Sequence, residues 1–334
     1  MDASCFPRAV AITLQSLKNA VWARVELRKY GDLLDSVTLQ PPIFILGHWR
    51  NGTTHLHQIM AQDKRFAFPN SYQVSFPQNF LSTEAWEAPM AALFLPPRRP
   101  MDGMEWTLAS PQEDEFALCA STWKSPCMGW VFPRQRERFA KYLTFRDVPP
   151  AEIGEWRDAF ERFLRKLQLR NDRPIILKSP PHTARVSLLL EMFPAAKFIH
   201  IHRNPVAVFQ SCRKAFDIIL DWHRLQRRDA NDLDEWIIRQ YREMYDAFFE
   251  ARPLIPAGQF CEVAFEELEE DPIGQVKKIY ETLGLPSFET FEPALREYMN
   301  SLAGYKKNAH PDLSPQWKAR LKSSWQRCFE EWGY

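Results

Sequence analysis

Hydrophobic side chains recur along this chain in two kinds of run, short β-forming stretches and longer stretches with helical spacing. Apolar residues at three- and four-residue steps predict a helix over residues 8–35 and another over 149–169. Short runs rich in β-branched and aromatic residues predict strands, and most are followed by a helical stretch. The predicted strands are residues 42–46, 173–178, 196–202 and 260–265. This alternation predicts right-handed βαβ units around a parallel sheet.

The first predicted strand ends in a glycine-rich turn that leads into a helix. Gly47 and Gly52 enclose four residues, and Thr53 and Thr54 follow at the start of the helix. This spacing is one residue away from the pattern G-x-x-x-x-G-K-[ST], whose backbone N–H groups and helix N-terminus face a phosphate. Thr53 stands in the lysine position, and Arg50 supplies positive charge instead. The turn predicts an anion site, with a tight strand-to-helix turn capped by threonine as the alternative.

Three of the predicted strands end in residues suited to anion binding. They end, in chain order, in Gly47, Lys178 and Arg203. In open α/β sheets ligands bind outside the carboxyl ends of the strands, so these three ends are expected to face one site. The predicted fold class is α/β, a P-loop-like parallel sheet flanked by helices in three layers, α/β/α.

A second stretch carries a resemblance to a known family. The strand before Arg203 leads into a helix that carries Ser211 eight residues later. The sequences Arg50-Asn-Gly-Thr-Thr54 and Arg203-Asn-Pro-x5-Ser211 together resemble the two co-substrate signatures of the sulfotransferases that use 3′-phosphoadenosine 5′-phosphosulfate (PAPS). The resemblance spans roughly residues 41–285 and is closest to the broad bacterial-type branch. It implies transfer of a sulfuryl group from PAPS to an acceptor hydroxyl, with 3′,5′-bisphosphoadenosine (PAP) as product.

The resemblance also implies roles for individual residues. The first loop would hold the 5′-phosphosulfate, and Arg203 with Ser211 would hold the 3′-phosphate. Arg50 and Lys178 are the cations expected at the transferred group, because the family carries a lysine in the loop and another after the strand. The residues that the loop would place around the 5′-phosphosulfate are Arg50, Asn51, Gly52, Thr53 and Thr54.

Two further nucleotide contacts are expected by the same resemblance. His55 stands where the animal cytosolic enzymes carry a tryptophan stacked on adenine, and a histidine there can stack or hydrogen-bond. Lys306, Lys307 and Asn308 resemble the late basic segment that closes over the nucleotide in the family. A solvated lysine pair is the alternative for that segment.

The acceptor hydroxyl needs a general base, for which three residues are candidates. Glu113 is preferred, then His182, then Glu115. His182 lies four residues after Lys178 and histidine titrates near neutrality. Ser110 followed by Pro111 predicts a helix N-terminus, in which Glu113 would have the structural role of closing a capping box.

Composition indicates which classes of binding partner and which cellular compartment are expected for this protein. The formal net charge is +1, with 43 basic and 42 acidic side chains, so there is no global field to attract nucleic acid. His and Cys show no metal-ligand spacing, and no metal is expected. Six cysteines without a CxxC pair favour a cytoplasmic protein. The aromatic stretch 66–145 favours an apolar acceptor such as a lipid, sterol or phenol.

A single sulfotransferase domain over residues 1–334 is expected, because α/β folds of this length often keep one core. It would comprise an N-terminal helical extension (1–40), a core (41–285) and a C-terminal helical segment (286–334) that ends in a closing helix over 316–332. The apolar side of the N-terminal helix is expected to dock on the domain, with peripheral membrane contact as the alternative.

Two other functions remain open on the sequence alone. One is a P-loop nucleotide kinase or NTPase, disfavoured by Thr53 in the lysine position and by the absence of an acidic residue at the end of the strand before Arg203. The other is a nucleotide-binding scaffold without turnover, which would tolerate loss of Lys178.

Overall fold

The computed structural model describes residues 2–98, 103, 104, 106–227, 233–302, 304 and 312–334. Its internal contacts divide the chain into two compact units, each assembled from separate stretches. The helical unit comprises Met1–Gln40, Ala67–Ile175 and Asp217–Asp229, and the sheet unit comprises Pro41–Phe66, Ile176–Phe216 and Ala230–Tyr334. The organisation of residues 1–334 as one domain stays a prediction.

The sheet unit is built on four parallel strands, as the alternation of apolar runs predicts. Their order is β2-β1-β3-β4, so β1 lies between the two strands that follow it in sequence. The strands are β1 (Ile43–Leu46), β2 (Ile176–Lys178), β3 (Lys197–His202) and β4 (Phe260–Ala264). Because all four are parallel, their carboxyl ends meet at one edge of the sheet.

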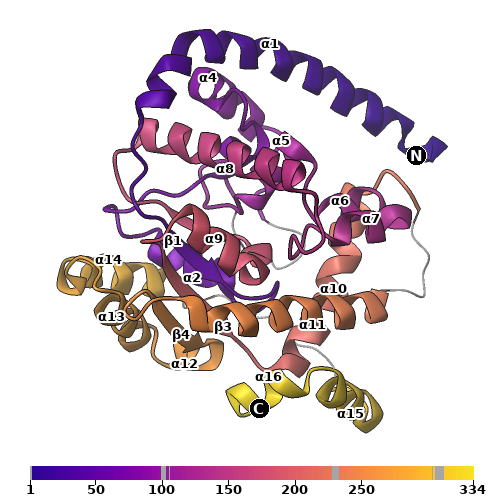
Figure 1. Cartoon of the computed structure of the whole chain (residues 1–334), viewed down its shortest axis with the longest axis vertical. Helices are drawn as coiled ribbons and strands as arrows, with labels where there is room; N and C mark the ends of the chain where they lie inside the picture. The colour runs from indigo at the N-terminus through magenta and orange to yellow at the C-terminus, as the bar shows by residue number, and fades with distance from the viewer. Residues whose placement is uncertain (1, 99–102, 105, 228–232, 303, 305–311) are drawn as a thin grey trace. The chain divides into compact units, whose positions relative to one another are not determined.

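Helices cover both faces of this sheet (Figure 1). On one face the isoleucines of β1 and β3 pack with α2 and α13 in a single apolar cluster. On the other, Phe44 stacks on Phe198 with ring centroids 5.5 Å apart, and His200 stacks on Phe248 of α11 at 4.3 Å. The helices are α2 (Thr53–Met60), η3 (Pro180–Arg185), α9 (Val186–Met192), α11 (Leu233–Ala251), η4 (Arg252–Leu254), α12 (Phe265–Glu270), α13 (Pro272–Leu283), α14 (Phe288–Ser301), α15 (Pro315–Ser324) and α16 (Gln326–Trp332). The predicted layered α/β class is confirmed.

The helical unit contains no strand among its described residues. Its elements are η1 (Ala3–Cys5), α1 (Phe6–Ser36), α3 (Ser71–Ser75), α4 (Phe80–Ala92), α5 (Glu115–Thr122), α6 (Met128–Val131), η2 (Pro133–Gln135), α7 (Arg136–Ala140) and α8 (Pro150–Arg170), and α10 (Pro205–His223) divides between the two units. Inside it, Lys166 of α8 forms a buried ion pair with Glu26 of α1. Burial lowers the pKa of Lys166 to about 8, against the opposing effect of Glu26. No helix within the described ranges is long and apolar enough to cross a bilayer.

Three predictions about helices need correction. The helix at Glu113 does not start at Ser110: residues 110–112 pair with 69–71 through an extended bridge, which keeps the backbone out of the helical region, and α5 begins at Glu115. The closing helix predicted over 316–332 is interrupted at Trp325, which separates α15 from α16. Helix α1 docks, but the apolar side that carries Val10, Leu14, Leu17, Val21 and Val25 is exposed; the helix is held instead by Glu26 and Leu34, which are buried, and by Trp22, which contacts Trp86.

Candidate active site

The glycine-rich loop is fixed at the end of β1 by close backbone contacts. The N–H of Gly47 donates to Oγ1 of Thr183 at 2.7 Å. Gly47 has φ +142°, and a Cβ there would lie 2.6 Å from the carbonyl oxygen of Ile201. Only glycine therefore lets β1 turn this close to β3.

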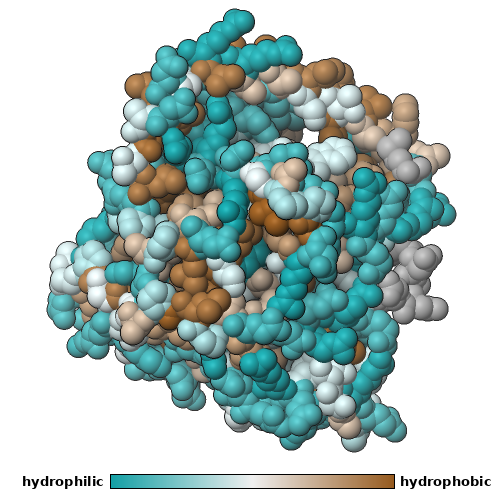
Figure 2. Space-filling view, viewed as in Figure 1, coloured by the Kyte–Doolittle hydropathy of each residue, from teal (hydrophilic) through white to brown (hydrophobic). Residues whose placement is uncertain are grey.

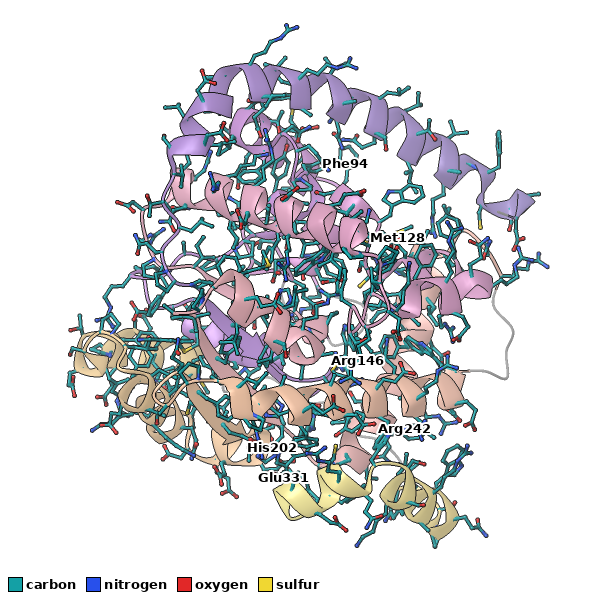
Figure 3. All side chains as sticks on the ribbon, in the orientation of Figure 1. Phe94, Met128, Arg146, His202, Arg242 and Glu331 are labelled. Carbon is teal, nitrogen blue, oxygen red and sulfur yellow. The ribbon has the colours of Figure 1, made fainter. Side chains whose placement is uncertain are left out.

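Arg50 connects the two sequence signatures. Its Nε donates to Oγ of Ser211 at 3.0 Å, although the two residues are 161 positions apart in the chain. Nη1 of Arg203 donates to the carbonyl oxygen of Arg50 at 3.2 Å. Arg50 has φ +73°, an uncommon conformation for a non-glycine residue, and strain of this kind gathers at binding sites. Two cations and a hydroxyl thus converge at the carboxyl ends of β1 and β3, where His202 is labelled in Figure 3.

Phe265 supports both the loop and Arg203. The guanidinium carbon of Arg203 lies 4.2 Å from the centre of the Phe265 ring, a cation–π distance. The same ring fills the space beside Gly52, where a Cβ would lie 2.2 Å from a ring carbon. Burial lowers the pKa of the Arg203 guanidinium, opposed by Glu269 and Glu266, and the group stays charged at neutral pH.

The buried side chain of Asn51 links the loop to β3 and α11 by hydrogen bonds. Its Nδ2 donates to the carbonyl oxygen of Ile201 at 3.0 Å and to the phenol oxygen of Tyr245 at 2.7 Å. That phenol oxygen also accepts from the N–H of His48 at 3.2 Å. Burial lowers the pKa of His48 to about 4, so the loop carries a neutral imidazole at pH 7. These contacts fix the Asn51 side chain inside the loop, and its binding of the co-substrate stays a prediction.

Lys178 and Thr54 meet beside the loop. Lys178 ends β2 and is 1% exposed, and its Nζ donates to Oγ1 of Thr54 at 3.3 Å. Thr53 is buried at the first turn of α2. His182 is buried within η3, and its ring meets Phe44 edge-on at 5.4 Å. The predicted convergence of the strand ends at Gly47, Lys178 and Arg203 is confirmed.

The remaining predicted residues fall in other places. His55 is partly buried in α2. Glu113 and Glu115 are buried in the helical unit, before and at the start of α5. Lys306, Lys307 and Asn308 lie outside the described residues.

Three residues that support the loop were not predicted from the sequence. The hydroxyl of Thr183 accepts a hydrogen bond from the N–H of Gly47, and the phenol oxygen of Tyr245 accepts one from the side chain of Asn51. The ring of Phe265 packs against the guanidinium of Arg203. The tyrosine has helical apolar spacing and the phenylalanine ends an apolar strand, so both patterns indicated core packing alone. Within the described part of the chain, no group of three or more His, Cys, Asp and Glu side chains could hold a metal ion.

Comparison with known proteins identifies the family. The model of the sulfotransferase family matches residues 41–290, about three quarters of the chain. The chain belongs to the sulfotransferase family. Two curated relatives, each an omega-hydroxy-beta-dihydromenaquinone-9 sulfotransferase Stf3, from Mycobacterium bovis and Mycobacterium tuberculosis, are 35% identical over 98% of this chain and 84% of theirs. The resemblance inferred from the two signatures is confirmed.

Solved sulfotransferases share the fold. The crystal structure of sulfotransferase STF9 from Mycobacterium avium aligns with TM-score 0.72 and 20% identity, covering 92% of this chain and 81% of that one. Sulfotransferase STF1 from Mycobacterium tuberculosis aligns with TM-score 0.64 and 20% identity, covering 91% and 80%. In this sulfotransferase, Arg50 and Arg203 form a cationic cluster within one unit, suited to a ligand with phosphate groups.

Proposed function

We propose that this sulfotransferase moves a sulfuryl group from PAPS to the hydroxyl of an apolar acceptor. The contact between Arg50 and Ser211 carries the proposal, since it joins the loop expected at the 5′-phosphosulfate to the helix expected at the 3′-phosphate. A donor with phosphates at both ends of one ribose requires two neighbouring anion sites. Kinase co-substrates lack the 3′-phosphate, so Arg203 and Ser211 would select PAPS over ATP.

The residues around the loop divide into binding and catalytic roles. Thr53, Thr54 and the loop amides would hold the 5′-phosphate, and Arg50 and Lys178 would face the oxygen that bridges phosphorus and sulfur. In the reaction that S–O bond breaks, a new S–O bond forms to the acceptor, and the acceptor proton passes to a base. Negative charge grows on the departing phosphate of PAP, where fixed cations stabilise the transition state more than the bound substrate. His55 is kept as the adenine contact, and Lys306, Lys307 and Asn308 as a closing segment. No metal is invoked.

The general base stays a prediction, with Glu113 ahead of His182 and Glu115. The ring of His182 packs against Phe44 in the core of the sheet unit, which favours a structural role for it. Glu113→Gln is expected to lower kcat about a hundredfold, because a carboxamide cannot accept the acceptor proton. The measurement is steady-state turnover beside PAP affinity, which should stay within a factor of three or so. If kcat is unchanged in Glu113→Gln and falls in Glu115→Gln or His182→Gln, the assignment moves to that residue.

The acceptor class is supported by the relatives. A chain 35% identical over 98% of this one is named for a hydroxylated menaquinone derivative. We therefore propose a hydroxyl carried on an isoprenoid or other long apolar lipid as the acceptor, consistent with the aromatic stretch 66–145. The cytoplasmic location is proposed on the cysteine usage.

Titration of PAP tests the donor assignment directly. Arg203→Ala is expected to weaken PAP binding about thirtyfold, because it removes a charged hydrogen-bond donor from the 3′-phosphate. Isothermal titration of the wild type with PAP, and with ATP plus magnesium, gives the reference affinities. Arg213→Ala is the matched control, since Arg213 lies on the same helix and pairs with Asp234 at 2.8 Å. Preference for ATP, or equal PAP affinity in both variants, contradicts the proposal.

A further inference from the structure

Over residues 18–26, helix α1 attaches to the helical unit mainly through polar and charged side chains, and Leu34 near its end is buried. Lys18 pairs with Glu87 of α4, and Asn19 accepts from Nδ2 of Asn79 at 3.3 Å. Glu26 accepts from the N–H of Ser82 at 2.9 Å and pairs with Lys166. Inside a unit whose other helices bury apolar residues, this arrangement is the reverse of ordinary amphipathic packing.

The opposite side of α1 presents a continuous apolar stripe. Its members recur at three- and four-residue steps, so they share one face over five turns of helix. Each is between 41% and 63% exposed. The stripe consists of Phe6, Val10, Leu14, Leu17, Val21 and Val25. Hydrophobic residues are visible along α1 across the top of Figure 2. An exposed apolar surface of this length marks an interaction site.

A second apolar group adjoins the stripe on α4. Trp86 contacts Trp22 of α1 with ring centroids 5.6 Å apart and is 45% exposed. Met90 near the end of α4 is 58% exposed, and Leu93 and Phe94 just beyond it are 82% and 88% exposed, with Phe94 labelled in Figure 3. Large side chains at such exposure, next to an aromatic pair, are typical of segments that enter the headgroup region of a bilayer.

The charges on α1 indicate whether the stripe binds a lipid surface or a second copy of the chain. Between Phe6 and Val25 the helix carries Arg8, Lys18 and Arg24 and no acidic residue. A self-pairing seam would continue through positions 24 and 28, where it needs apolar residues, but both positions are exposed arginines. Arginines that continue the line of an apolar stripe at its end, where their long side chains can reach outward, instead suit anionic headgroups.

We propose that the stripe of α1 and the apolar end of α4 bind the surface of an anionic lipid bilayer. The stripe lies in the hydrocarbon boundary, and Arg24 and Arg28 lie among the headgroups. No residue of the transfer reaction takes part, so vesicle binding is measured with the full chain in the absence of PAPS and acceptor. Failure of this proposal leaves the sulfotransferase assignment untouched.

Vesicle co-sedimentation tests the proposal with a matched pair of variants. The wild type is expected to bind vesicles of phosphatidylcholine with phosphatidylglycerol. Leu14→Gln/Leu17→Gln/Val21→Gln is expected to lower the partition coefficient more than about tenfold, because three apolar side chains leave the interface. The control Ile12→Gln/Leu27→Gln changes side chains of the same helix that are 49% and 52% exposed but lie off the stripe, and it should bind as the wild type.

A charge variant and a mass measurement complete the test. Arg24→Gln/Arg28→Gln should weaken binding to the anionic vesicles about tenfold and leave binding to pure phosphatidylcholine unchanged. Equal binding of the stripe and control variants overturns the proposal. The proposal is also overturned if the wild type does not bind vesicles but sediments as a dimer, and the stripe variant sediments as a monomer. That result would show that the face mediates self-association.

Discussion

Replacing Lys178 by methionine is expected to lower kcat about a thousandfold, because it removes the buried cation that we propose lies beside the departing phosphate. Lys178 is 1% exposed and ends β2 next to the loop, so bulk ions cannot take its place. Methionine keeps most of the length and the apolar stem. Turnover at saturating PAPS measures the effect, and thermal unfolding verifies that the fold is retained.

Thr54→Val separates the charge of Lys178 from its hydrogen bond. The lysine donates to the threonine hydroxyl at 3.3 Å, a long contact whose loss should lower kcat less than tenfold. PAP affinity should fall by less than kcat in Lys178→Met, since the charge difference is largest in the transition state. A thousandfold loss in Thr54→Val, or a kcat near wild type in Lys178→Met, would remove Lys178 from the catalytic group.

Gly52→Ala is expected to lower the free energy of unfolding by about 3 kcal/mol and PAP affinity about a hundredfold. At φ +96° an alanine is strained by about 1 kcal/mol. Its Cβ would also lie 2.2 Å from a carbon of Phe265, and moving a packed ring costs about 1–3 kcal/mol more. The guanidinium of Arg203 packs on the face of Phe265, so the proposed 3′-phosphate site would be displaced with the ring.

Gly258→Ala is the control for backbone strain alone. Gly258 has φ +80°, and a Cβ there meets nothing within 4 Å. It should therefore lose only about 1 kcal/mol and bind PAP as the wild type does. Chemical denaturation and PAP titration of both variants decide the matter: equal losses in stability and unchanged PAP affinity in Gly52→Ala would exclude Phe265 as the support of Arg203.

The strands and the residues at their carboxyl ends could be predicted because their signals are local. Glycine spacing, β-forming runs and the position of Arg203 before a helix each depend on a few neighbours in sequence. The contact between Arg50 and Ser211 could only be expected through a family resemblance, since nothing local places residues 161 positions apart together. The supporting roles of Tyr245 and Phe265 could not be predicted, because side chains that support a site from the core show the same hydrophobic periodicity as ordinary core residues.

The wrong predictions have a common physical origin. At Ser110 the capping sequence does not start a helix, because residues 110–112 form backbone hydrogen bonds with residues 69–71, which are distant in sequence. In α1 the periodicity was predicted correctly but the buried side was not, since the buried ion pair of Glu26 with Lys166 holds a polar side inward. Propensity and periodicity define an element, whereas tertiary contacts decide where it starts and which face it buries.

The strand order has a consequence for how the chain is made. β1 is flanked by β2 and β3, both of which lie more than a hundred residues later in the sequence. During synthesis at roughly 5–20 residues per second, β1 leaves the ribosome on the order of ten seconds before its neighbours. For that interval Ile43–Leu46, an apolar strand buried on all sides in the finished fold, has both edges open. A nascent-chain chaperone that binds this segment would therefore protect β1 and the glycine-rich loop after it before β2 and β3 are made.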